Sequence, residues 1–284
     1  MEMTEIIRTV AEIRKYVEDQ KGQRKKVGLI PTMGAFHQGH LTLMNLARKE
    51  CGSVITSVFV NPIQFSAGED YDQYPRQPER DMKMAESEEV DIMFIPDVAQ
   101  MYPKGFDTHV DQNEKGLPSK LCGPFRPGHF RGVMTVVLKL FAVVRPNLAY
   151  MGQKDYQQFL ITRRMSLDLN LDVEVHLLPT LREEDGLAMS SRNIYLGPKQ
   201  RKDATILYDS LMRAKEMVGN GESSAVKVTT AMKKQIRAVK GARIDYIAVV
   251  NSETLEPLKE IKGKTLIALS VRIGKARLID NILL

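Results

Sequence analysis

Short apolar runs alternate with helix-like segments over about the first 180 residues, and this alternation limits the fold more than any other feature of the sequence. The apolar runs predict strands at residues 27–30, 54–60, 91–95, 148–151 and 173–178. Apolar residues at helical spacing predict helices at residues 6–17, 41–49, 78–89, 133–144 and 155–169. Such alternation predicts an α/β fold, with a parallel sheet covered by helices.

The pattern changes after about Pro179. Residues 198–217 and 223–239 are predicted helices, and residues 243–251, 265–273 and 276–284 are predicted strands. Two helices followed by a few strands predict a small α+β domain with an antiparallel sheet. We therefore expect two domains, residues 1–180 around the parallel sheet and residues 181–284 as a smaller α+β domain.

The net charge of the 284-residue chain is +6, with a pI of about 9.1, which permits nucleic-acid binding without establishing it. Basic residues are scattered apart from the short cluster at residues 24–26, and Trp is absent. Aromatic and basic residues do not alternate as they do in a base-stacking platform. An anionic small molecule suits the same charge balance, so we expect no nucleic-acid partner.

The sequence predicts neither a membrane span nor a secretory signal. No apolar run approaches the roughly 20 residues that cross a bilayer, and acidic residues interrupt the apolar residues of the N-terminus. Two cysteines, Cys51 and Cys122, are too few for a disulfide framework. We therefore expect a cytoplasmic protein without a membrane association.

The ten residues at positions 31–40, PTMGAFHQGH, follow a predicted strand and precede a predicted helix. A helix N-terminus presents N–H groups and a partial positive charge, which suit a phosphate. Gly34 and Gly39 allow the backbone to approach a ligand closely. The imidazoles of His37 and His40 add hydrogen-bond donors at the same place. The motif therefore indicates nucleotide chemistry.

Two other interpretations of this motif stay open. Histidines three residues apart can also be zinc ligands, although His109, His129 and His176 and the two cysteines form no second paired motif. A glycine-containing turn can also be purely structural. The motif matches neither the G-x-G-x-x-G fingerprint nor the Walker-type loop, so it supports neither of those nucleotide-binding loops.

Three further polar segments carry candidate binding residues. Asn61 and Gln64 lie in NPIQF, and their amides can bind the hydroxyl and carboxylate groups of a small polar substrate. Residues 152–158, GQKDYQQ, offer a lysine for phosphate and an aspartate for a helix cap, a ribose hydroxyl or Mg²⁺. Residues 189–193, MSSRN, offer two hydroxyls and a guanidinium. Taken singly, each segment is equally well explained as an ordinary turn, cap or linker.

Three of these segments follow predicted strands directly: PTMGAFHQGH, NPIQF and GQKDYQQ. Ligands of open parallel sheets bind beyond the carboxyl ends of the strands. We therefore expect the three segments to converge at one edge of the sheet.

The segments are specific in combination. PTMGAFHQGH, FVNPIQF, YPR, RPGHFRGV, GQKDYQQ, DGLAMSSRN and ARLIDN, in this order, closely resemble the pantothenate synthetase (pantoate–β-alanine ligase) family from about Val27 to Asn281. That family is similar to class I aminoacyl-tRNA synthetases and nucleotidyltransferases, and HQGH and MSSRN correspond in style to two of their motifs. The resemblance implies a Rossmann-like domain for ATP and pantoate at residues 1–180 and a lid domain at residues 181–284.

The resemblance also implies a two-step reaction. The carboxylate of (R)-pantoate attacks the α-phosphorus of ATP, which gives pantoyl adenylate and pyrophosphate. The amine of β-alanine then attacks the activated carbonyl, which releases AMP and pantothenate for coenzyme A biosynthesis. This chemistry needs fixed donors that bring two anions together more than it needs a nucleophile. The implied partners are these small molecules, Mg²⁺ carried mainly by ATP, and a second copy of the chain in a homodimer.

The site residues follow from the match to the family's motifs. The implied catalytic residues are His40, His37, Lys154 and Arg192. The implied ATP-binding residues are Met33, Gly34, Ala35, Phe36, His37, Gln38, Gly39, His40, Gly152, Gln153, Lys154, Asp155, Leu181, Met189, Ser190, Ser191 and Arg192. The implied residues for pantoate and β-alanine are Gln64, Gln158 and Asn61. Among them, His40 is the expected proton donor.

One position departs from the family's pattern. Gln38 stands where an acid usually separates the first histidine from the glycine of the motif, and we expect its side chain to point away from phosphate. The resemblance further implies a mobile lid, which would exclude water from an adenylate that otherwise hydrolyses.

Two rival functions stay open. Another adenylate-forming or nucleotidyl-transferring enzyme of the same superfamily would share the phosphate motif, although Asn61 and two glutamines suit a hydroxy acid better than a phosphate monoester. The rival from a different class is an RNA-binding module on a synthetase-like fold, but the sequence has no evident anticodon-binding domain and no basic stripe.

Overall fold

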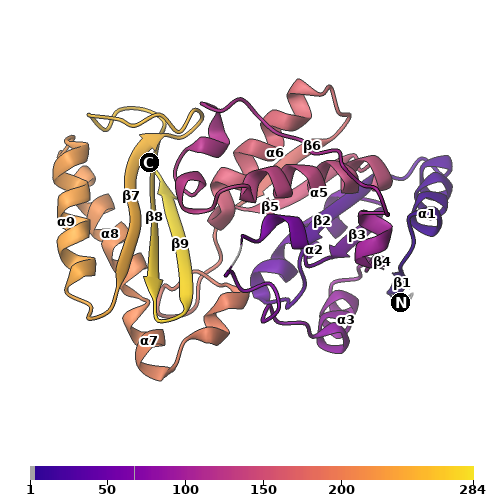
Figure 1. The fold of residues 1–284 in the computed structure, drawn as a ribbon, viewed down its shortest axis with the longest axis horizontal. Helices are drawn as coiled ribbons and strands as arrows, with labels where there is room; N and C mark the ends of the chain where they lie inside the picture. The colour runs from indigo at the N-terminus through magenta and orange to yellow at the C-terminus, as the bar shows by residue number, and fades with distance from the viewer. Residues whose placement is uncertain (1–3, 67) are drawn as a thin grey trace. The chain divides into compact units, whose positions relative to one another are not determined.

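The computed structural model describes residues 4–66 and 68–284, which form two compact units (Figure 1). Within those residues, the first unit comprises residues up to 113 together with 126–152 and 158–179. The second unit comprises residues 114–125, 153–157 and 180–284. Two short stretches before residue 180 therefore belong to the second unit.

The first unit is built on a parallel sheet. Its six strands in the described part of the chain lie in the order β1-β4-β3-β2-β5-β6, and every neighbouring pair is parallel. The strands are β1 (Glu5–Ile7), β2 (Val27–Thr32), β3 (Ser53–Val58), β4 (Ile92–Phe94), β5 (Leu148–Gly152) and β6 (Glu174–Leu178). The predicted α/β class with a parallel sheet is confirmed.

Helices cover both faces of this sheet. They are α1 (Val10–Gly22), α2 (Gln38–Glu50), α3 (Pro78–Ser87), α4 (Val98–Met101), α5 (His129–Val144) and α6 (Tyr156–Asp168). Leu29 and Ile30 of β2 are both fully buried although successive side chains of a strand point to opposite faces. Burial on both faces explains why the strands are continuous apolar runs rather than alternating ones.

The predicted helix at residues 6–17 is wrong at its start. Ile6 and Ile7 belong to β1, which pairs with Met93 and Phe94 of β4. The helix begins only after Thr9, whose hydroxyl accepts a hydrogen bond from the N–H of Glu12 at 3.2 Å. The Glu12 carboxylate in turn accepts from the N–H of Thr9, and this capping box fixes the boundary.

Strand β2 lies at the point where the chain reverses its direction across the sheet. From β2 the chain continues through α2 to β3 on one side, whereas from β5 it continues through α6 to β6 on the other. Strands β2 and β5 are hydrogen-bonded neighbours, with Gly28 opposite Leu148. The crevice beyond the carboxyl ends of two such strands is the usual ligand site of an open α/β sheet.

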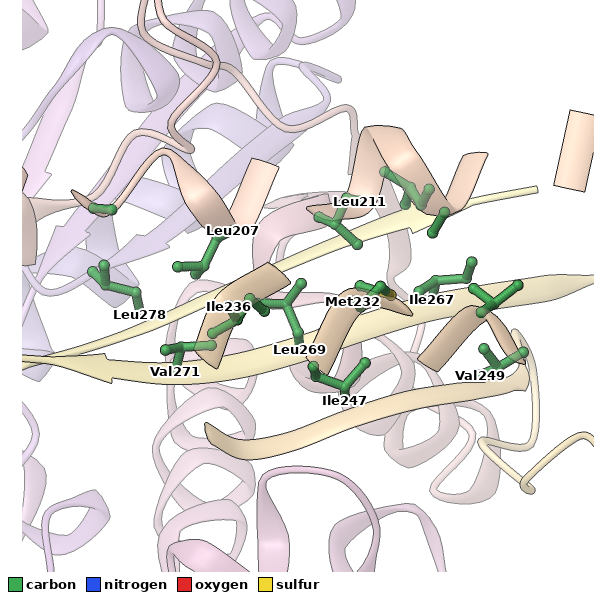
Figure 2. Close-up of a cluster of buried hydrophobic side chains, with 14 of the residues drawn as sticks. Leu207, Leu211, Met232, Ile236, Ile247, Val249, Ile267, Leu269, Val271 and Leu278 are labelled. Atoms are coloured by element: carbon green, nitrogen blue, oxygen red, sulfur yellow. The ribbon is translucent and has the colours of Figure 1, made fainter. Parts of the chain in front are cut away.

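The second unit has an antiparallel sheet of the order β7-β8-β9, as predicted. Its strands are β7 (Arg243–Asn251), β8 (Thr265–Ile273) and β9 (Ala276–Leu283), and its helices are α7 (Pro198–Asp203), α8 (Ile206–Gly219) and α9 (Ala225–Arg237). Leu207, Leu211, Met232 and Ile236 of the helices pack on the sheet and form the core in Figure 2.

The single helix predicted at residues 198–217 is wrong, because α7 and α8 are separate. The N–H of Thr205 donates to the carbonyl of Lys202, and the N–H of Leu207 donates to that of Ala204. These tight i to i−3 bonds replace the α-helical pattern between the two helices.

In the described part of the chain, no helix is both long and apolar enough to cross a membrane.

Candidate active site

The segment after β2 is held in shape from within the first unit. Gly34 and Ala35 both have a positive φ, at 82° and 54°. A Cβ on Gly34 would lie 2.9 Å from Cγ1 of Val58, so the turn requires glycine there for both its backbone angle and its space. The hydroxyl of Thr32 accepts from the N–H of Gly34 at 3.1 Å and ties the turn to the strand.

A buried carboxylate from α3 orients the same segment. The two oxygens of Asp81 accept from the N–H groups of Ala35 at 2.8 Å and Phe36 at 2.7 Å. Burial raises the pKa of Asp81, whereas the two backbone N–H groups favour its ionised form. A side chain 45 or more positions along the chain therefore sets the backbone that leads into α2.

His37 and His40 lie at the N-terminus of α2, as predicted. The Nδ1 atom of His37 accepts from the N–H of Gly39 at 3.1 Å, and Nδ1 of His40 accepts from the N–H of His37 at 3.2 Å. The ring centroids are 4.1 Å apart. An imidazole whose Nδ1 accepts carries its proton on Nε2, so both rings present Nε2–H as a donor.

The N-terminus of α2 adds positive electrostatic potential next to the two imidazoles. Gln38 is the first residue of α2, and the N-terminus of the helix presents a partial positive charge together with its first N–H groups. Two imidazoles and a helix N-terminus on the same turn are groups suited to binding an anion such as phosphate.

Asn61 and Gln64 lie together on the short helix η1 (Pro62–Gln64) and its cap after β3. The Asn61 amide donates from Nδ2 to Oε1 of Gln64 and to the carbonyl of Gly132, each at 3.1 Å. Oδ1 of Asn61 accepts from the hydroxyl of Tyr102 at 2.7 Å. Burial raises the pKa of Tyr102, so its hydroxyl remains a donor. The Asn61 amide thus orients Gln64.

This orientation leaves Nε2 as the donor of the Gln64 side chain. Nε2 lies 3.1 Å from the sulfur of Met33, so the structure brings together a candidate substrate residue and a candidate ATP residue. The segments that follow β2 and β3 therefore meet, as the adjacency of these strands requires.

The main chain of Gln64 is fixed by a second group of side chains. Nδ1 of His129 donates to the carbonyl of Gln64 at 2.9 Å, which leaves Nε2 of His129 to accept from Nη1 of Arg126 at 2.8 Å. Arg126 also donates to both oxygens of Glu69, at 2.7 and 2.6 Å. Gln158, the other predicted substrate residue, is half-buried on the first turn of α6.

Gly152 ends β5, and residues 153–155 form the short helix η4 of the second unit. The ammonium of Lys154 lies 2.9 Å from the carboxylate of Asp155 and is mostly buried, with a side-chain exposure of 20%. Asn281 of β9 donates from Nδ2 to the carbonyls of Gln153 at 2.9 Å and Lys154 at 3.1 Å. Lys154 therefore lies in this short turn, directly before α6.

Residues 181–192 of the second unit fold back on themselves. The N–H of Met189 donates to the carbonyl of Leu181 at 3.0 Å, and Arg182 and Ala188 pair as an antiparallel bridge. This pairing brings together Leu181 and Met189, two of the implied ATP-binding residues. Ser190 then caps η5 (Ser191–Tyr195), with its hydroxyl accepting from the N–H of Arg192 at 3.3 Å.

Four residues in this arrangement were not predicted from the sequence as site residues: Asp81, Tyr102, His129 and Asn281. The position of Asp81 in the sequence gives one indication of its role. It lies four residues before Ala85, so both residues fall on the buried face of α3. An acid at a buried helical position needs a partner. His129 and Asn281 lie within RPGHFRGV and ARLIDN, two of the segments that resemble the family, and this resemblance is the signal that could have identified them. Tyr102 contacts a residue far away in the sequence, which no spacing rule identifies.

The zinc interpretation requires further ligands beside the histidines. Among residues 4–66 and 68–284, no group of three or more His, Cys, Asp or Glu side chains could hold a metal ion. The Nδ1 atoms of His37 and His40 both accept from the backbone, which further limits metal binding by this pair.

The parallel sheet, its direction reversal beside β2 and the histidine-capped helix after that strand define a nucleotide-binding α/β protein of the class I synthetase and nucleotidyltransferase type. The model of the pantoate–β-alanine ligase family matches residues 5–283. The chain belongs to that family and is a ligase.

Relatives agree with this assignment over nearly their whole length. The chain is 49% identical to the pantothenate synthetase of Acetivibrio thermocellus, covering 98% of both chains, and 50% identical to that of Thermotoga neapolitana, covering 98% and 99%. A crystal structure of pantothenate synthetase from Thermus thermophilus matches with a TM-score of 0.93 at 47% identity, covering 98% and 99%. A pantoate–β-alanine ligase from Francisella tularensis, complexed with β,γ-ATP and β-alanine, matches with a TM-score of 0.82 at 33% identity, covering 99% and 98%.

Proposed function

We propose that this ligase condenses (R)-pantoate with β-alanine through a pantoyl-adenylate intermediate. One observation carries the proposal: His37 and His40 present two Nε2–H donors at the N-terminus of α2, with their Nδ1 atoms held by the backbone. The complex of the Francisella relative with β,γ-ATP and β-alanine supports ATP and β-alanine as substrates.

In the first step, a carboxylate oxygen of pantoate attacks the α-phosphorus of ATP. A new C–O–P linkage forms, the bond between the α-phosphorus and the bridging oxygen breaks, and pyrophosphate leaves with the electron pair. Two anions must approach each other in this step, so fixed donors lower the barrier by offsetting the negative charge that develops on the leaving group. His37 binds the phosphates, and His40 donates a proton or hydrogen bond to the leaving pyrophosphate.

In the second step, the amine of β-alanine attacks the activated carbonyl. The amide bond forms, the bond between the carbonyl carbon and the phosphate oxygen breaks, and AMP leaves while the amine loses a proton. No side chain forms a covalent bond with the substrate in either step. Positioning and electrostatic stabilisation are therefore the enzyme's contribution.

The other implied site residues bind and position the two substrates of the first step. Gln64 and Gln158 bind pantoate, and Asn61 supports Gln64 through the hydrogen bond between their side chains. Lys154 and Arg192 provide positive charge for phosphate, and Asp155 binds the ribose. The backbone of residues 33–40, together with Gly152, Gln153, Leu181 and residues 189–191, contacts the rest of the nucleotide.

Mg²⁺ enters this reaction as part of the substrate complex. Because the described residues offer no cluster of acidic, histidine or cysteine ligands, we propose that ATP carries the ion. The two cysteines are both free, which fits the reducing cytoplasm as the place of action. We also retain the homodimer expected from the family resemblance.

Isotope exchange between pyrophosphate and ATP tests this proposal. Exchange should require pantoate and proceed without β-alanine, because the first step alone reverses to ATP. Exchange that needs no pantoate, or that runs equally with a phosphate monoester in its place, would overturn the proposal in favour of another adenylate-forming or nucleotidyl-transferring enzyme. Tight RNA binding with a steep salt dependence would favour the RNA-binding rival.

A further inference from the structure

Strand β9 of the second unit carries two adjacent buried polar residues, Asp280 and Asn281, which are 2% and 3% exposed. Successive side chains of a strand point to opposite faces of its sheet. Asp280 shares its face with Leu278 and Ile282, which belong to the core under α8 and α9. Asn281 therefore points to the other face.

Each residue holds a different candidate nucleotide segment of the same unit. On one face, Asn281 donates to the carbonyls of Gln153 and Lys154 and accepts from Nε2 of Gln153 at 3.2 Å. Its amide is therefore committed to the turn that carries the phosphate-binding lysine. An amide whose donors and acceptor are all used fixes that turn in one conformation.

On the other face, Asp280 binds the segment that leads to Met189–Arg192. Its two oxygens accept from Nη1 and Nη2 of Arg182 at 2.6 and 3.0 Å, which is the bidentate geometry of the strongest Arg–carboxylate pairs. Arg182 also donates to the carbonyl of Gly186 at 3.1 Å and lies over the ring of Tyr208 at 4.7 Å.

Positive charge from both segments acts on Asp280. Burial raises the pKa of Asp280, whereas hydrogen bonds and charge from Arg182 and the positive charge of Lys154 favour its ionised form. Asp280 additionally accepts from the backbone N–H of Asn281 at 2.8 Å. One dipeptide of β9 thus contacts both segments that supply positive charge and hydroxyl donors to the proposed ATP site.

We propose that Asp280 and Asn281 are positioning residues that fix the Lys154 turn and the 181–192 segment for ATP. The proposal rests on the function proposed above. A core position would be satisfied by apolar residues, so two buried polar side chains whose bonds end on these two segments indicate a positioning role rather than a packing role. Neither residue touches the substrate in this proposal; each acts through the segment that it holds.

The first test compares Asn281→Ala with a matched control. Asn251 caps a turn after β7 in the same unit, with Oδ1 accepting from the N–H groups of Glu253 and Thr254 at 2.9 and 3.0 Å. We expect Asn281→Ala to lower kcat/KM for ATP by about tenfold to hundredfold, through loss of the bonds that hold Lys154. Asn251→Ala should leave kcat/KM for ATP within about twofold of wild type, and both variants should keep the pantoate KM.

A double-mutant cycle with Lys154→Ala shows whether Asn281 acts through the lysine. If it does, Asn281→Ala should have at most a small further effect on ATP binding in the Lys154→Ala background. Affinity for a non-hydrolysable ATP analogue, measured by calorimetry on the full chain, gives the readout without turnover. Full additivity of the two changes would overturn the role of Asn281, because a merely structural residue has no such coupling to the lysine.

Asp280→Asn is the test on the other face. It leaves Arg182 buried without a charged partner, so the variant can fail to fold. The double variant Asp280→Asn with Arg182→Met removes both charges, so no buried charge is left without a partner and ATP binding can be measured on folded protein. Affinity for the analogue should fall about tenfold in the folded double variant, and a wild-type affinity would overturn the role of Asp280.

Failure of this inference is distinguishable from failure of the proposed function. Wild-type protein that forms no pantothenate from pantoate, β-alanine and ATP would refute the function. Wild-type protein that forms pantothenate, together with an Asn281→Ala variant of unchanged kcat/KM for ATP, would refute the positioning role alone.

Discussion

At the scale of single residues, the imidazoles of His37 and His40 have the most sharply defined chemistry, because the backbone of their own helix end occupies both Nδ1 atoms. Each ring therefore keeps its donor on Nε2, where a phosphate oxygen would accept it. A lysine at either position would bring a charge but no fixed direction. The pair is suited to hold and protonate a leaving pyrophosphate.

His40→Ala should lower the rate of adenylate formation by about 10² to 10⁴-fold, because the residue acts on charge that develops in the transition state. Single-turnover kinetics measures the rate at which pantoyl adenylate forms. A thermal melt of the same variant separates this effect from unfolding. The control is His109→Ala, at an exposed histidine of the same unit. A His40→Ala variant with wild-type turnover would remove His40 from the catalytic residues.

Gln64→Ala should raise the pantoate KM by about tenfold or more while the ATP KM changes less than about twofold. The reason is that Asn61 binds Oε1 of Gln64, which leaves Nε2 as the group that donates to pantoate in the proposed site. Steady-state kinetics with each substrate varied in turn checks this. Gln100→Ala, at an exposed glutamine of the same unit, serves as the control, and an unchanged pantoate KM for Gln64→Ala would contradict the role of Gln64.

At the scale of elements, the position of Gln64, a proposed pantoate-binding residue, depends on how closely α5 approaches η1. Gly132 of α5 lies so close to η1 that a Cβ would lie 2.6 Å from Cα and 2.7 Å from N of Gln64. The carbonyl of Gly132 also accepts a hydrogen bond from Nδ2 of Asn61 at 3.1 Å. A glycine is needed here for space, since its helical φ suits any residue.

Gly132→Ala should therefore displace η1 from α5. We expect a loss of about 1–3 kcal/mol in the free energy of unfolding and a raised pantoate KM, because overpacking must shift the backbone of Gln64. Denaturant melts and kinetics check both effects. Gly22→Ala is the matched control, at a helical glycine with no atom within 4 Å of the added Cβ, and equal behaviour of the two variants would contradict the steric argument.

Glu69, in the loop between η1 and α3, forms an ion pair with Arg126, which lies three residues before α5. The contribution of this ion pair to stability should depend on pH. Burial raises the pKa of Glu69, but the hydrogen bonds and charge of Arg126 outweigh it and hold the pKa below its ordinary value of 4.5. A carboxyl whose pKa is lower in the folded state contributes stability above the unfolded pKa, and this contribution disappears as the pH falls through the folded pKa.

Glu69→Gln should therefore reduce the free energy of unfolding by about 1–3 kcal/mol near neutral pH. The difference from wild type should stay constant down to about pH 4.5 and shrink as the pH falls further. Denaturant unfolding at a series of pH values measures it. A difference that grows towards acid pH would have the wrong sign for this ion pair.

At the scale of the whole molecule, the described residues supply no preformed metal centre, and each unit has its own apolar core. In the proposed function Mg²⁺ enters with ATP, so it should be needed for the reaction and not for the fold. The homodimer, the mobile lid and the division of the chain into domains at residue 180 stay predictions.

Removal of divalent metal with EDTA should abolish pantothenate formation and leave the thermal unfolding temperature of the protein without ATP within about 1 °C. Added Mg²⁺ should restore activity fully. Scanning calorimetry and an AMP-release assay on the same sample test both parts. A large fall in unfolding temperature upon chelation would indicate a structural metal and contradict the view that ATP carries the ion.

The sequence alone determined the order and type of most strands and helices, because periodicity and β-branched apolar runs are local properties. It also placed His37 and His40 at a helix start, since a strand, a glycine-containing turn and an amphipathic segment follow one another directly there. It misplaced the start of α1 and merged α7 with α8, where hydrogen bonds of Thr9 and of the 204–205 turn override the apolar spacing.

Only the tertiary structure decided how the site residues are oriented. Four side chains fix the backbone or amides of residues that lie 41 to 128 positions away in the sequence: Asp81, Tyr102, His129 and Asn281. Such contacts arise when the sheet order brings distant segments together, and no local pattern encodes them. The sequence thus specified which groups could carry the chemistry, and long-range packing specified the direction in which each group points.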